Sequence, residues 1–248
     1  MTQIKSEEEI KIIAAGGRIL ANVLSQIEKM VKPGITTIEL DRAAEALILK
    51  HGAKPAFKGY DGFPYSLCAS VNEEIVHGFP SERILKEGDI IGLDLGVFYK
   101  GYNSDMAVTV AVGEVSFEAK RLIIVTKKAL KRGIKKVRPG NTIGDIGNTI
   151  QRYVEDQGLS VVRDLCGHGI GKDVHEDPKI PNFGVRHKGE ILKEGMVICL
   201  EPMVTMGDWR LKKAKDGYGY ATKDGSLAAH FEHTIAVTKK GARVLTEI

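Results

Sequence analysis

Residues 84–88 read ILKEG, and residues 191–195 read ILKEG again, 107 positions later (191 − 84). A second pair of segments, VKPG at 31–34 and VRPG at 137–140, lies 106 positions apart (137 − 31). A period this long, present in two copies, does not fit a solenoid, whose units have about 20 to 50 residues. The repetition indicates two homologous halves in one chain, at approximately residues 1–113 and 114–248.

Each half begins with two predicted helices, whose starts are marked by capping residues and whose ends are followed by glycine or proline. The expected N-caps are Ser6, Thr36, Ser116 and Thr142 or its neighbour Asn141. The helices are expected over residues 6–30, 36–52, 116–137 and 141–158. Segments rich in β-forming residues follow each pair of helices, at 89–98 and 103–112 and then at 196–206 and 228–237.

Helices followed by antiparallel strands, twice over, describe an α+β fold in which a pseudo-twofold axis relates the two halves. A chain of 248 residues can bury about three quarters of the surface that its unfolded form exposes. We therefore expect a single domain over residues 1–248. The seam between the halves is the natural place for a pocket.

The composition is that of a folded globular protein. Hydrophobic residues make up 43% and charged residues 27%, which excludes a disordered or collagen-like chain. The 36 basic residues exceed the 32 acidic residues by only four, too weak a bias to indicate sequence-specific binding of nucleic acid. The three cysteines, Cys68, Cys166 and Cys199, are odd in number and lack paired spacing, so neither a disulfide framework nor a zinc ribbon is expected.

The sequence contains no uninterrupted apolar run near the roughly 20 residues of a membrane span. The first nine residues carry acids and lack the apolar core of a secretory signal. We therefore expect a cytoplasmic protein that does not cross a membrane.

Two aspartates are expected to face one spot on a β-hairpin. Lys100 and Gly101 suit a tight turn, and centring the turn on them pairs residue 94 with residue 107. Asp94 and Asp105 then share a face as diagonal neighbours, about 7 Å apart at the backbone. For Asp94 alone, a strand-end aspartate bonded to backbone amides is an equally good interpretation, although an acid within an apolar strand is costly without a positive partner.

The second half supplies two more acids at equivalent places. Adding the offset of 107 to position 94 gives Glu201, and Glu232 leads into the strand-like run 234–237 as Asp105 leads into 107–110. Four acids packed together without cations would repel one another and take up protons, so a metal cluster is the economical explanation. His168 adds an imidazole nitrogen, although a histidine between glycines is more often a loop residue. This donor set suits Mn(II), Fe(II), Co(II) or Zn(II), as two ions bridged by shared carboxylates.

The motifs around these residues closely resemble those of type I methionine aminopeptidases, and the match spans almost the whole chain. The motifs are CGHGIG at 166–171, LEP at 200–202 and FEHT at 231–234. The resemblance implies the pita-bread fold, in which two pseudo-symmetric α+β halves enclose a dinuclear metal site. It also implies that Asp94 binds one ion and that His168 and Glu201 bind the other, with Asp105 and Glu232 bridging both.

The same resemblance implies the activity. The expected reaction removes the N-terminal methionine of nascent proteins and peptides, preferring a small second residue, and a hydroxide that bridges two divalent ions (Co, Mn, Fe(II) or Zn) attacks the first peptide bond. Glu201 would act as the proton shuttle. His77 and His175 match two histidines that bind and polarise the substrate peptide.

The residues that match the family's methionine pocket are Tyr60, Phe63 and Cys68, and Tyr218 is also expected to contact the substrate. Three positions depart from the family pattern. Val174 and Tyr218 stand where larger aromatic residues are frequent, and His230 stands where glutamine is common. These departures are expected to change the shape of the pocket and not the metal site.

Three other functions compete with this interpretation. A prolidase or aminopeptidase P shares the fold but usually carries an additional N-terminal domain. A cysteine hydrolase would use Cys166 and His168, which are only two positions apart and lack an orienting acid. A non-enzymatic relative of the fold would be expected to have lost ligand positions, whereas all five are filled here.

One segment bears on partners other than the substrate peptide. Apolar residues recur at helical spacing over 123–137, and lysine or arginine fills most other positions up to 138. A solvated outer helix is the favoured interpretation. Contact with ribosomal RNA is the alternative, which would suit an enzyme that acts on nascent chains, and we otherwise expect a monomer.

Overall fold

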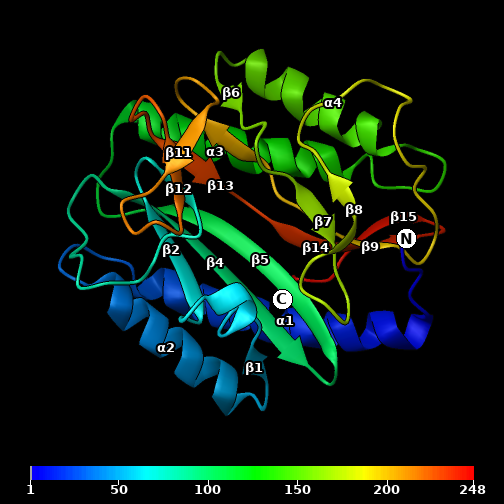
Figure 1. The fold of residues 1–248 in the computed structure, drawn as a ribbon, viewed down its shortest axis with the longest axis horizontal. Coiled ribbons are helices and arrows are strands. Elements are labelled where there is room, and N and C mark those ends of the chain that lie inside the picture. Colours follow the sequence, from blue (N-terminus) through cyan, green and yellow to red (C-terminus); the bar gives the residue numbers. More distant parts are fainter. Residues whose placement is uncertain (1) are drawn as a thin grey trace.

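A long antiparallel hairpin runs through the centre of the protein, whose computed structural model describes residues 2–248 (Figure 1). Its strands are β4 (Ile90–Tyr99) and β5 (Tyr102–Ala111). Lys100 and Gly101 form the turn with φ angles of 48° and 89°, the positive values that a type I′ turn requires. The predicted register is confirmed, because Asp94 lies opposite Ala107.

Four α-helices lie within residues 2–248, two in each half of the chain. They are α1 (Glu7–Met30), α2 (Thr37–Lys50), α3 (Phe117–Ile134) and α4 (Ile143–Glu155). The hydroxyl groups of Ser6, Thr36, Ser116 and Thr142 cap the four N-termini, as predicted. α3 ends three residues earlier than expected, and Val137 is buried beyond its end.

The two larger sheets are antiparallel throughout, and each belongs to one half. In the first, β4 pairs with β5, β1 (Lys54–Pro55) and β2 (Leu67–Val71). In the second, the strand order is β15 (Gly241–Val244), β14 (His233–Thr238), β9 (Val197–Leu200), β7 (Gly167–Gly169) and β8 (Glu176–Ile180).

Two three-stranded sheets complete the fold. One contains β13 (Ala228–His230), β10 (Met203–Thr205) and β6 (Ser160–Val161), all from the second half. The other contains β11 (Leu211–Lys213), β12 (Tyr220–Thr222) and β3 (Glu74–Val76), so that it joins strands from both halves. A short 3₁₀ helix, η1 (Tyr60–Gly62), precedes β2.

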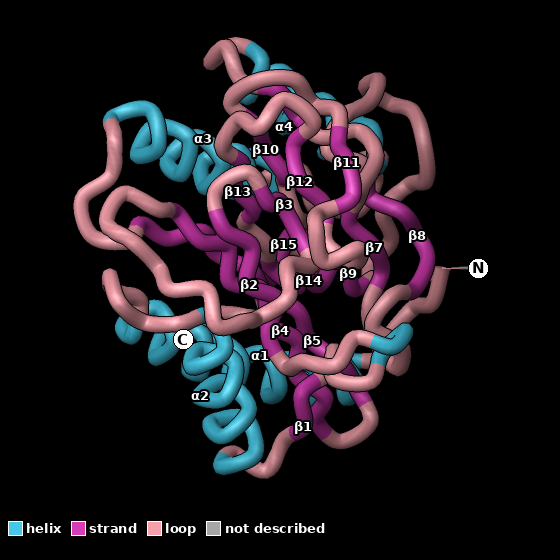
Figure 2. Tube along the Cα trace, turned by 60° about the vertical axis from the view of Figure 1, so that its left-hand side comes forward, coloured by secondary structure: helices cyan, strands magenta, loops and turns pink. Residues whose placement is uncertain are grey.

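Helices lie on the two outer sides of the molecule and strands lie between them (Figures 1 and 2). α1 and α2 cover the first sheet, where Leu24, Ile48 and Leu93 are fully buried. α3 and α4 cover strands of the second half, where Leu122 and Ile150 are fully buried. Each half therefore has its own large apolar core, as expected of two duplicated units.

The same isolated contact occurs once in each half, at the segment that revealed the repetition. Thr36 forms an antiparallel bridge to Ile84, and Thr142 forms one to Ile191. In both cases the N-cap residue of the second helix pairs with the first residue of an ILKEG copy. The contact supports the predicted division of the chain into two related halves.

α1 is long and apolar enough to cross a membrane by length and composition alone. The sequence did not show this as one apolar run, because Arg18 and other polar residues interrupt the helix. Half of its most apolar window is buried inside the protein, and it packs against β4 and β5. A Cβ atom on Gly17 would lie 2.3 Å from the carbonyl oxygen of Leu245, so the glycine permits this close packing. These contacts are those of a core helix.

Candidate metal centre and substrate pocket

The first two acids come from neighbouring strands of the central hairpin. Asp94 on β4 and Asp105 on β5 are buried, with 8% and 4% of their surfaces exposed. Because Asp94 pairs with Ala107, Asp105 is its diagonal neighbour on the same face. The hairpin register therefore fixes these two carboxylates side by side.

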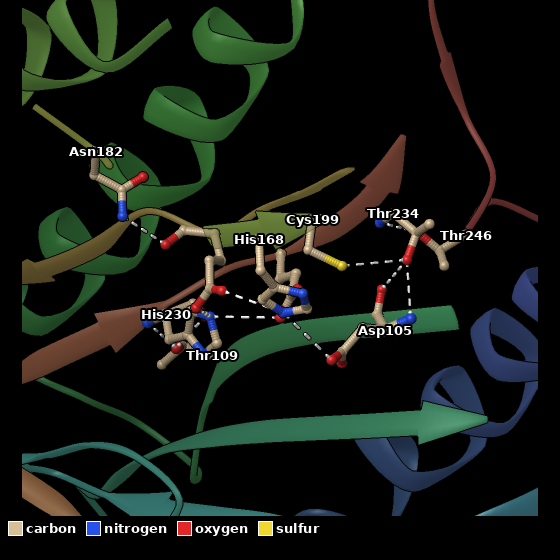
Figure 3. Close-up of polar contacts among 10 residues, drawn as sticks. Asp105, Thr109, His168, Asn182, Cys199, His230, Thr234 and Thr246 are labelled. Carbon is tan, nitrogen blue, oxygen red and sulfur yellow. Dashed lines mark hydrogen bonds and ion pairs between the residues drawn. The ribbon is translucent and has the colours of Figure 1, made fainter. Parts of the chain in front are cut away.

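The other two acids come from the equivalent strands of the second half. Glu201 follows the last residue of β9, and Glu232 precedes the first residue of β14. The backbone N–H of Glu232 donates to the carbonyl oxygen of Ala107 on β5, at 2.8 Å. Glu201 accepts a hydrogen bond at its own carbonyl from the Asn182 side chain, at 2.9 Å (Figure 3). These bonds hold both acids at the seam between the halves.

A threonine joins the two strand pairs directly. The Thr234 hydroxyl accepts a bond from the backbone N–H of Asp105 at 2.9 Å and lies 2.8 Å from the carbonyl oxygen of the same residue, to which it donates (Figure 3). The acids of β5 and β14 are therefore fixed by contacts between the halves as well as within them.

His168 lies at the middle of β7 and faces this cluster (Figure 3). Its Nε2 atom is 3.6 Å from Oε1 of Glu201 and 4.0 Å from Oδ2 of Asp105. Its Nδ1 atom is 2.8 Å from the carbonyl oxygen of Gly169, an acceptor that favours the proton on Nδ1 and leaves the Nε2 lone pair toward the acids. Burial, followed by the nearby His175, lowers the pKa of His168 to about 3, so the ring is neutral near pH 7.

The four acids form an electrostatically uncompensated group. Burial first, and the neighbouring carboxylates second, raise the pKa values of Asp105, Glu201 and Glu232 well above their usual range. Burial also raises the pKa of Asp94. Within residues 2–248, no lysine or arginine forms an ion pair with any of the four.

Several buried polar atoms of the four acids and of the neighbouring His230 have no hydrogen-bond partner. They are Oδ1 of Asp94, Oδ1 of Asp105, Oε1 of Glu232 and Nε2 of His230. Donor atoms of Asp105, His168, Cys199 and Glu232 all lie within 4.8 Å of one another, as do those of Glu201, His230 and Glu232. Divalent cations would satisfy the orphaned oxygens and balance the charge, so the residues fit the predicted metal site.

All the predicted site residues line one cavity of about 340 Å³. These are the metal-site residues Asp94, Asp105, His168, Glu201 and Glu232 and the substrate residues Tyr60, Phe63, Cys68, His77, His175 and Tyr218. The sequence did not indicate six further lining residues: Phe57, Asp61, Val76, Leu165, Lys213 and Tyr220. Of these, only Tyr220 carried a local signal, since it lies two positions after Tyr218 on the way into β12.

One end of the cavity is apolar. Phe57, Phe63, Cys68 and Val174 form a buried cluster against which Tyr218 packs. Cys68 lies on β2 directly opposite Asp94, so the cluster adjoins the acids. Tyr218 lines the cavity, whereas Val174 belongs to the apolar cluster and is not among the lining residues.

His175 and Tyr60 form a pair beside the metal site. The Nδ1 atom of His175 is 2.9 Å from the Tyr60 hydroxyl, and its ring centroid is 4.4 Å from that of His168. Burial lowers the pKa of His175 and raises that of Tyr60, so both are neutral near pH 7. An exposed, neutral imidazole next to the acids can donate a hydrogen bond to a substrate carbonyl.

His77 lines the same cavity. Its φ angle is 60°, an uncommon value for a residue with a side chain, and it follows β3 directly. Its ring lies 6.3 Å from that of Tyr218 and 6.1 Å from that of Tyr220, between centroids. Burial, followed by the charges of His230 and His175, lowers the pKa of His77 to about 4.

The segment that carries His175 is anchored from two sides. Asn103 on β5 donates from its backbone and its side chain to the carbonyl oxygen of Gly171, at 2.7 and 3.1 Å. Glu176 forms an ion pair with Lys5, and the exposed fractions of the two side chains are only 5% and 3%. The N-terminal segment before α1 thereby holds a substrate-site residue.

Cys166 does not have the surroundings of a nucleophile. Burial raises the pKa of its thiol, and the thiolate is the reactive form. The Nδ1 atom of His168 is engaged by Gly169, and its Nε2 atom faces the acids. The cysteine-hydrolase alternative therefore lacks a paired base.

His230 occupies a place that the sequence did not predict. It is 3% exposed and is absent from the residues that line the cavity. Its Nε2 atom is instead 3.4 Å from Oε2 of Glu201 and 3.7 Å from Oε2 of Glu232. We expected the change at this position to affect the pocket and not the metal site. The structure contradicts this, because the His230 side chain faces the acids and not the pocket.

Comparisons with known proteins agree with this geometry. Residues 11–239 match metallopeptidase family M24. The methionine aminopeptidase of Clostridium perfringens is 50% identical over 248 residues, which cover 100% of both chains. The structure of a methionine aminopeptidase from Thermotoga maritima superposes with a TM-score of 0.98, at 44% identity and over 100% of both chains. The resemblance and the pita-bread α+β fold predicted from the sequence are confirmed.

A prolidase from Pyrococcus furiosus is also similar, with a TM-score of 0.78 and 26% identity. The match covers 99% of this chain but only 65% of the prolidase.

Proposed function

The chain belongs to metallopeptidase family M24 and is a metallo-exopeptidase, and from this membership we propose that it removes the N-terminal methionine of nascent proteins and peptides whose second residue is small. The observation that carries the proposal is a single cavity in which four buried acids and His168 adjoin an apolar pocket. The cavity joins the chemistry of a metal site to a place for one apolar side chain.

The acids and His168 would hold two divalent ions. We propose that Asp94 binds one, that His168 and Glu201 bind the other, and that Asp105 and Glu232 bridge them. When bound, such ions polarise the scissile carbonyl and lower the pKa of a water molecule. The oxygen-rich donor set with one imidazole accepts Mn(II), Fe(II), Co(II) or Zn(II).

Glu201 is the proposed proton shuttle. Its carboxylate lines the cavity beside the other proposed ligands, where it can reach the attacking water. It would accept a proton from the attacking water and deliver it to the leaving amine. The products are free methionine and a peptide shortened by one residue.

His175 is proposed to stabilise the oxyanion. Tyr60 stays protonated because its pKa is raised, and its hydroxyl can donate to Nδ1 of His175. Nδ1 would then be the acceptor and the single ring proton would lie on Nε2, from which it can be donated to the carbonyl oxygen of the scissile bond. His77, which also lines the cavity, would contact the second residue of the substrate and limit its size.

The methionine side chain is proposed to occupy the apolar end of the cavity. Phe63, Cys68 and Phe57 are each less than 10% exposed there. An unbranched thioether adapts to such an irregular apolar space, whereas lysine or aspartate would have to bury a charge. Aromatic rings also make favourable contacts with sulfur.

The proposal is tested by the release of free methionine from the peptide Met-Ala-Ser. Protein reconstituted with Co(II) or Mn(II) should release methionine, and the same protein after chelation should not. Restoring the metal should restore the activity. Release that is equal with and without metal would contradict the proposed mechanism.

We propose that the enzyme acts as a cytoplasmic monomer that can contact the ribosome. The hollow beside α3 and α4 is lined by Arg132, Lys136, Arg138, Arg152 and Arg186. None of these five side chains forms an ion pair with a residue of the described chain, 2–248. Cosedimentation with ribosomes should fall steeply with salt concentration, and charge reversal of Lys136 and Arg138 should weaken that dependence. Absent or salt-insensitive cosedimentation would remove this part of the proposal.

A further inference from the structure

His230 is a second buried imidazole at the acid cluster. It lies at the end of β13, two residues before Glu232. Its backbone is fixed by Thr109 on β5, whose hydroxyl accepts from the His230 N–H at 2.9 Å and donates to its carbonyl oxygen at 2.8 Å (Figure 3). The direction in which the ring points is therefore set by contacts between the two halves.

The ring nitrogen that faces the acids has no hydrogen-bond partner. The Nε2 atom is 3.4 Å from Oε2 of Glu201 and 3.7 Å from Oε2 of Glu232, yet it makes a hydrogen bond to neither. A charge-assisted hydrogen bond would be about 2.7 to 2.9 Å long. A buried polar atom left unsatisfied is costly, so the geometry calls for a partner between these groups.

The distances fit donor atoms that share one cation. Metal–ligand bonds of about 2.1 Å place neighbouring donors about 3.0 to 3.4 Å apart in octahedral or tetrahedral sites. Glu201, Glu232 and His230 each present one donor atom, and the three atoms lie within 4.8 Å of one another.

We propose that His230 is a metal ligand, which binds through Nε2 to the cation that Glu201 and Glu232 also hold. The site then has two imidazoles, His168 and His230, with the four carboxylates. The inference rests on the proposed metal-dependent function. It adds a ligand that the sequence pattern did not predict.

The test counts imidazoles bound to Co(II) in the whole protein. A histidine that binds paramagnetic Co(II) through Nε2 gives a strongly shifted, exchangeable N–H signal from Nδ1 in the proton NMR spectrum. The wild-type protein should show two such signals, and His230→Gln should show one. Co(II) binding by His230→Gln, measured by competition with a chelator, should be weakened at least roughly tenfold, since even outer partners of metal ligands contribute 10- to 100-fold.

His233→Asn is the matched control, because His233 bonds to Thr246 through Nδ1 and is not among the proposed ligands. It should keep both signals. A single signal in the wild-type protein would overturn the inference, since His230 would then act only as a neighbour of the carboxylates. Because that count is made on the wild type, it stands even if the glutamine variant does not fold.

The outcomes for function and inference are separable. Wild-type protein that releases methionine but shows one signal retains the proposed function and loses this ligand. If the wild-type protein binds no Co(II), both the proposed function and the His230 ligand are contradicted. Two signals that persist in His230→Gln would also overturn the inference, because the second imidazole would then be a different residue.

Discussion

At the scale of single residues, Glu201 is the group on which turnover should depend most. Glu201→Gln keeps the shape of the side chain but removes the charge and the basic oxygen. Methionine release from Met-Ala-Ser should therefore fall at least about 100-fold. The folded structure should survive, as judged by circular dichroism, and near-normal turnover would contradict the proton-shuttle role.

Cys166 separates the metal mechanism from a thiol mechanism. Since burial raises the pKa of this thiol, it is protonated near pH 7 and no step of the reaction is assigned to it. Cys166→Ser should keep at least about a third of wild-type turnover, because the substitution removes little volume and no reacting group. Loss of activity at unchanged metal content, measured by atomic emission, would revive the thiol alternative.

His233 should make the free energy of unfolding depend on pH. Burial, and then Lys127 and Lys131, lower its pKa to about 4 in the folded state, against 6.5 ordinarily. Between these values the unfolded chain binds a proton that the folded chain does not, so stability falls as pH falls, by up to about 1.4 kcal/mol per pH unit.

His233→Asn removes this titration while its amide can still reach Thr246. Urea unfolding of the metal-free proteins should show a loss between pH 7 and pH 5 that is smaller in the variant by about 2 kcal/mol. An identical loss in both proteins would contradict the lowered pKa.

The positions of the four acids among the proposed ligands could be predicted because each lies on a regular feature of the sequence. Asp94 and Asp105 follow from the register of one hairpin, and Glu201 follows from the repeat offset. Phe57 and Leu165 could not be predicted as pocket residues, because chain segments far from the acids in sequence bring them to the cavity. The sequence showed His230 only as a departure from the family pattern. The direction of its ring could not be predicted, because it depends on backbone bonds to Thr109 in the other half.

At the scale of elements, the buried ion pair of Lys5 and Glu176 should matter for both stability and turnover. Lys5→Met leaves a buried carboxylate without a partner, which typically costs about 3 to 5 kcal/mol. It also frees the segment that carries His175. Both the unfolding midpoint and kcat/KM for Met-Ala-Ser should fall, the latter at least about tenfold.

The matched control is Lys11→Met, since the pair of Lys11 with Glu8 is largely exposed. An exposed pair contributes about 0 to 1 kcal/mol, so this variant should behave like the wild type. Glu176→Gln in the Lys5→Met background should recover stability by removing the unpaired charge. Equal behaviour of the Lys5 and Lys11 variants would contradict the anchoring role.

Helices were predictable as elements, whereas the short strands were not. A hydroxyl cap at Ser6 or Thr142 is a local signal, and the structure uses it where the sequence places it. β1 and β6 have two residues each, and each is a strand only because a distant strand pairs with it. Pairing of this kind cannot be read from a local pattern.

At the scale of the whole molecule, duplication explains why the site lies where it does. Each half supplies a pair of strands with acids at equivalent positions, and the two pairs meet at the seam. Glu232 bonds to Ala107 and Thr234 bonds to Asp105, so neither half can hold its acids in place alone. Helices far from the seam stabilise the halves, and the seam itself carries the chemistry.

The central claim is that this cavity accepts an N-terminal methionine followed by a small residue. The most direct measurement offers Met-Ala-Ser, Leu-Ala-Ser, Met-Lys-Ser and Ala-Pro-Ser together to the Co(II)-loaded protein and follows each by mass spectrometry. We predict that Met-Ala-Ser is cleaved first and that Met-Lys-Ser is largely refused, because His77, whose ring lies 6.3 Å from that of Tyr218 in the same cavity, is proposed to limit the size of the second residue. Preferential cleavage of Ala-Pro-Ser would contradict the claim, since it is the result expected of a prolidase-like enzyme with the same fold.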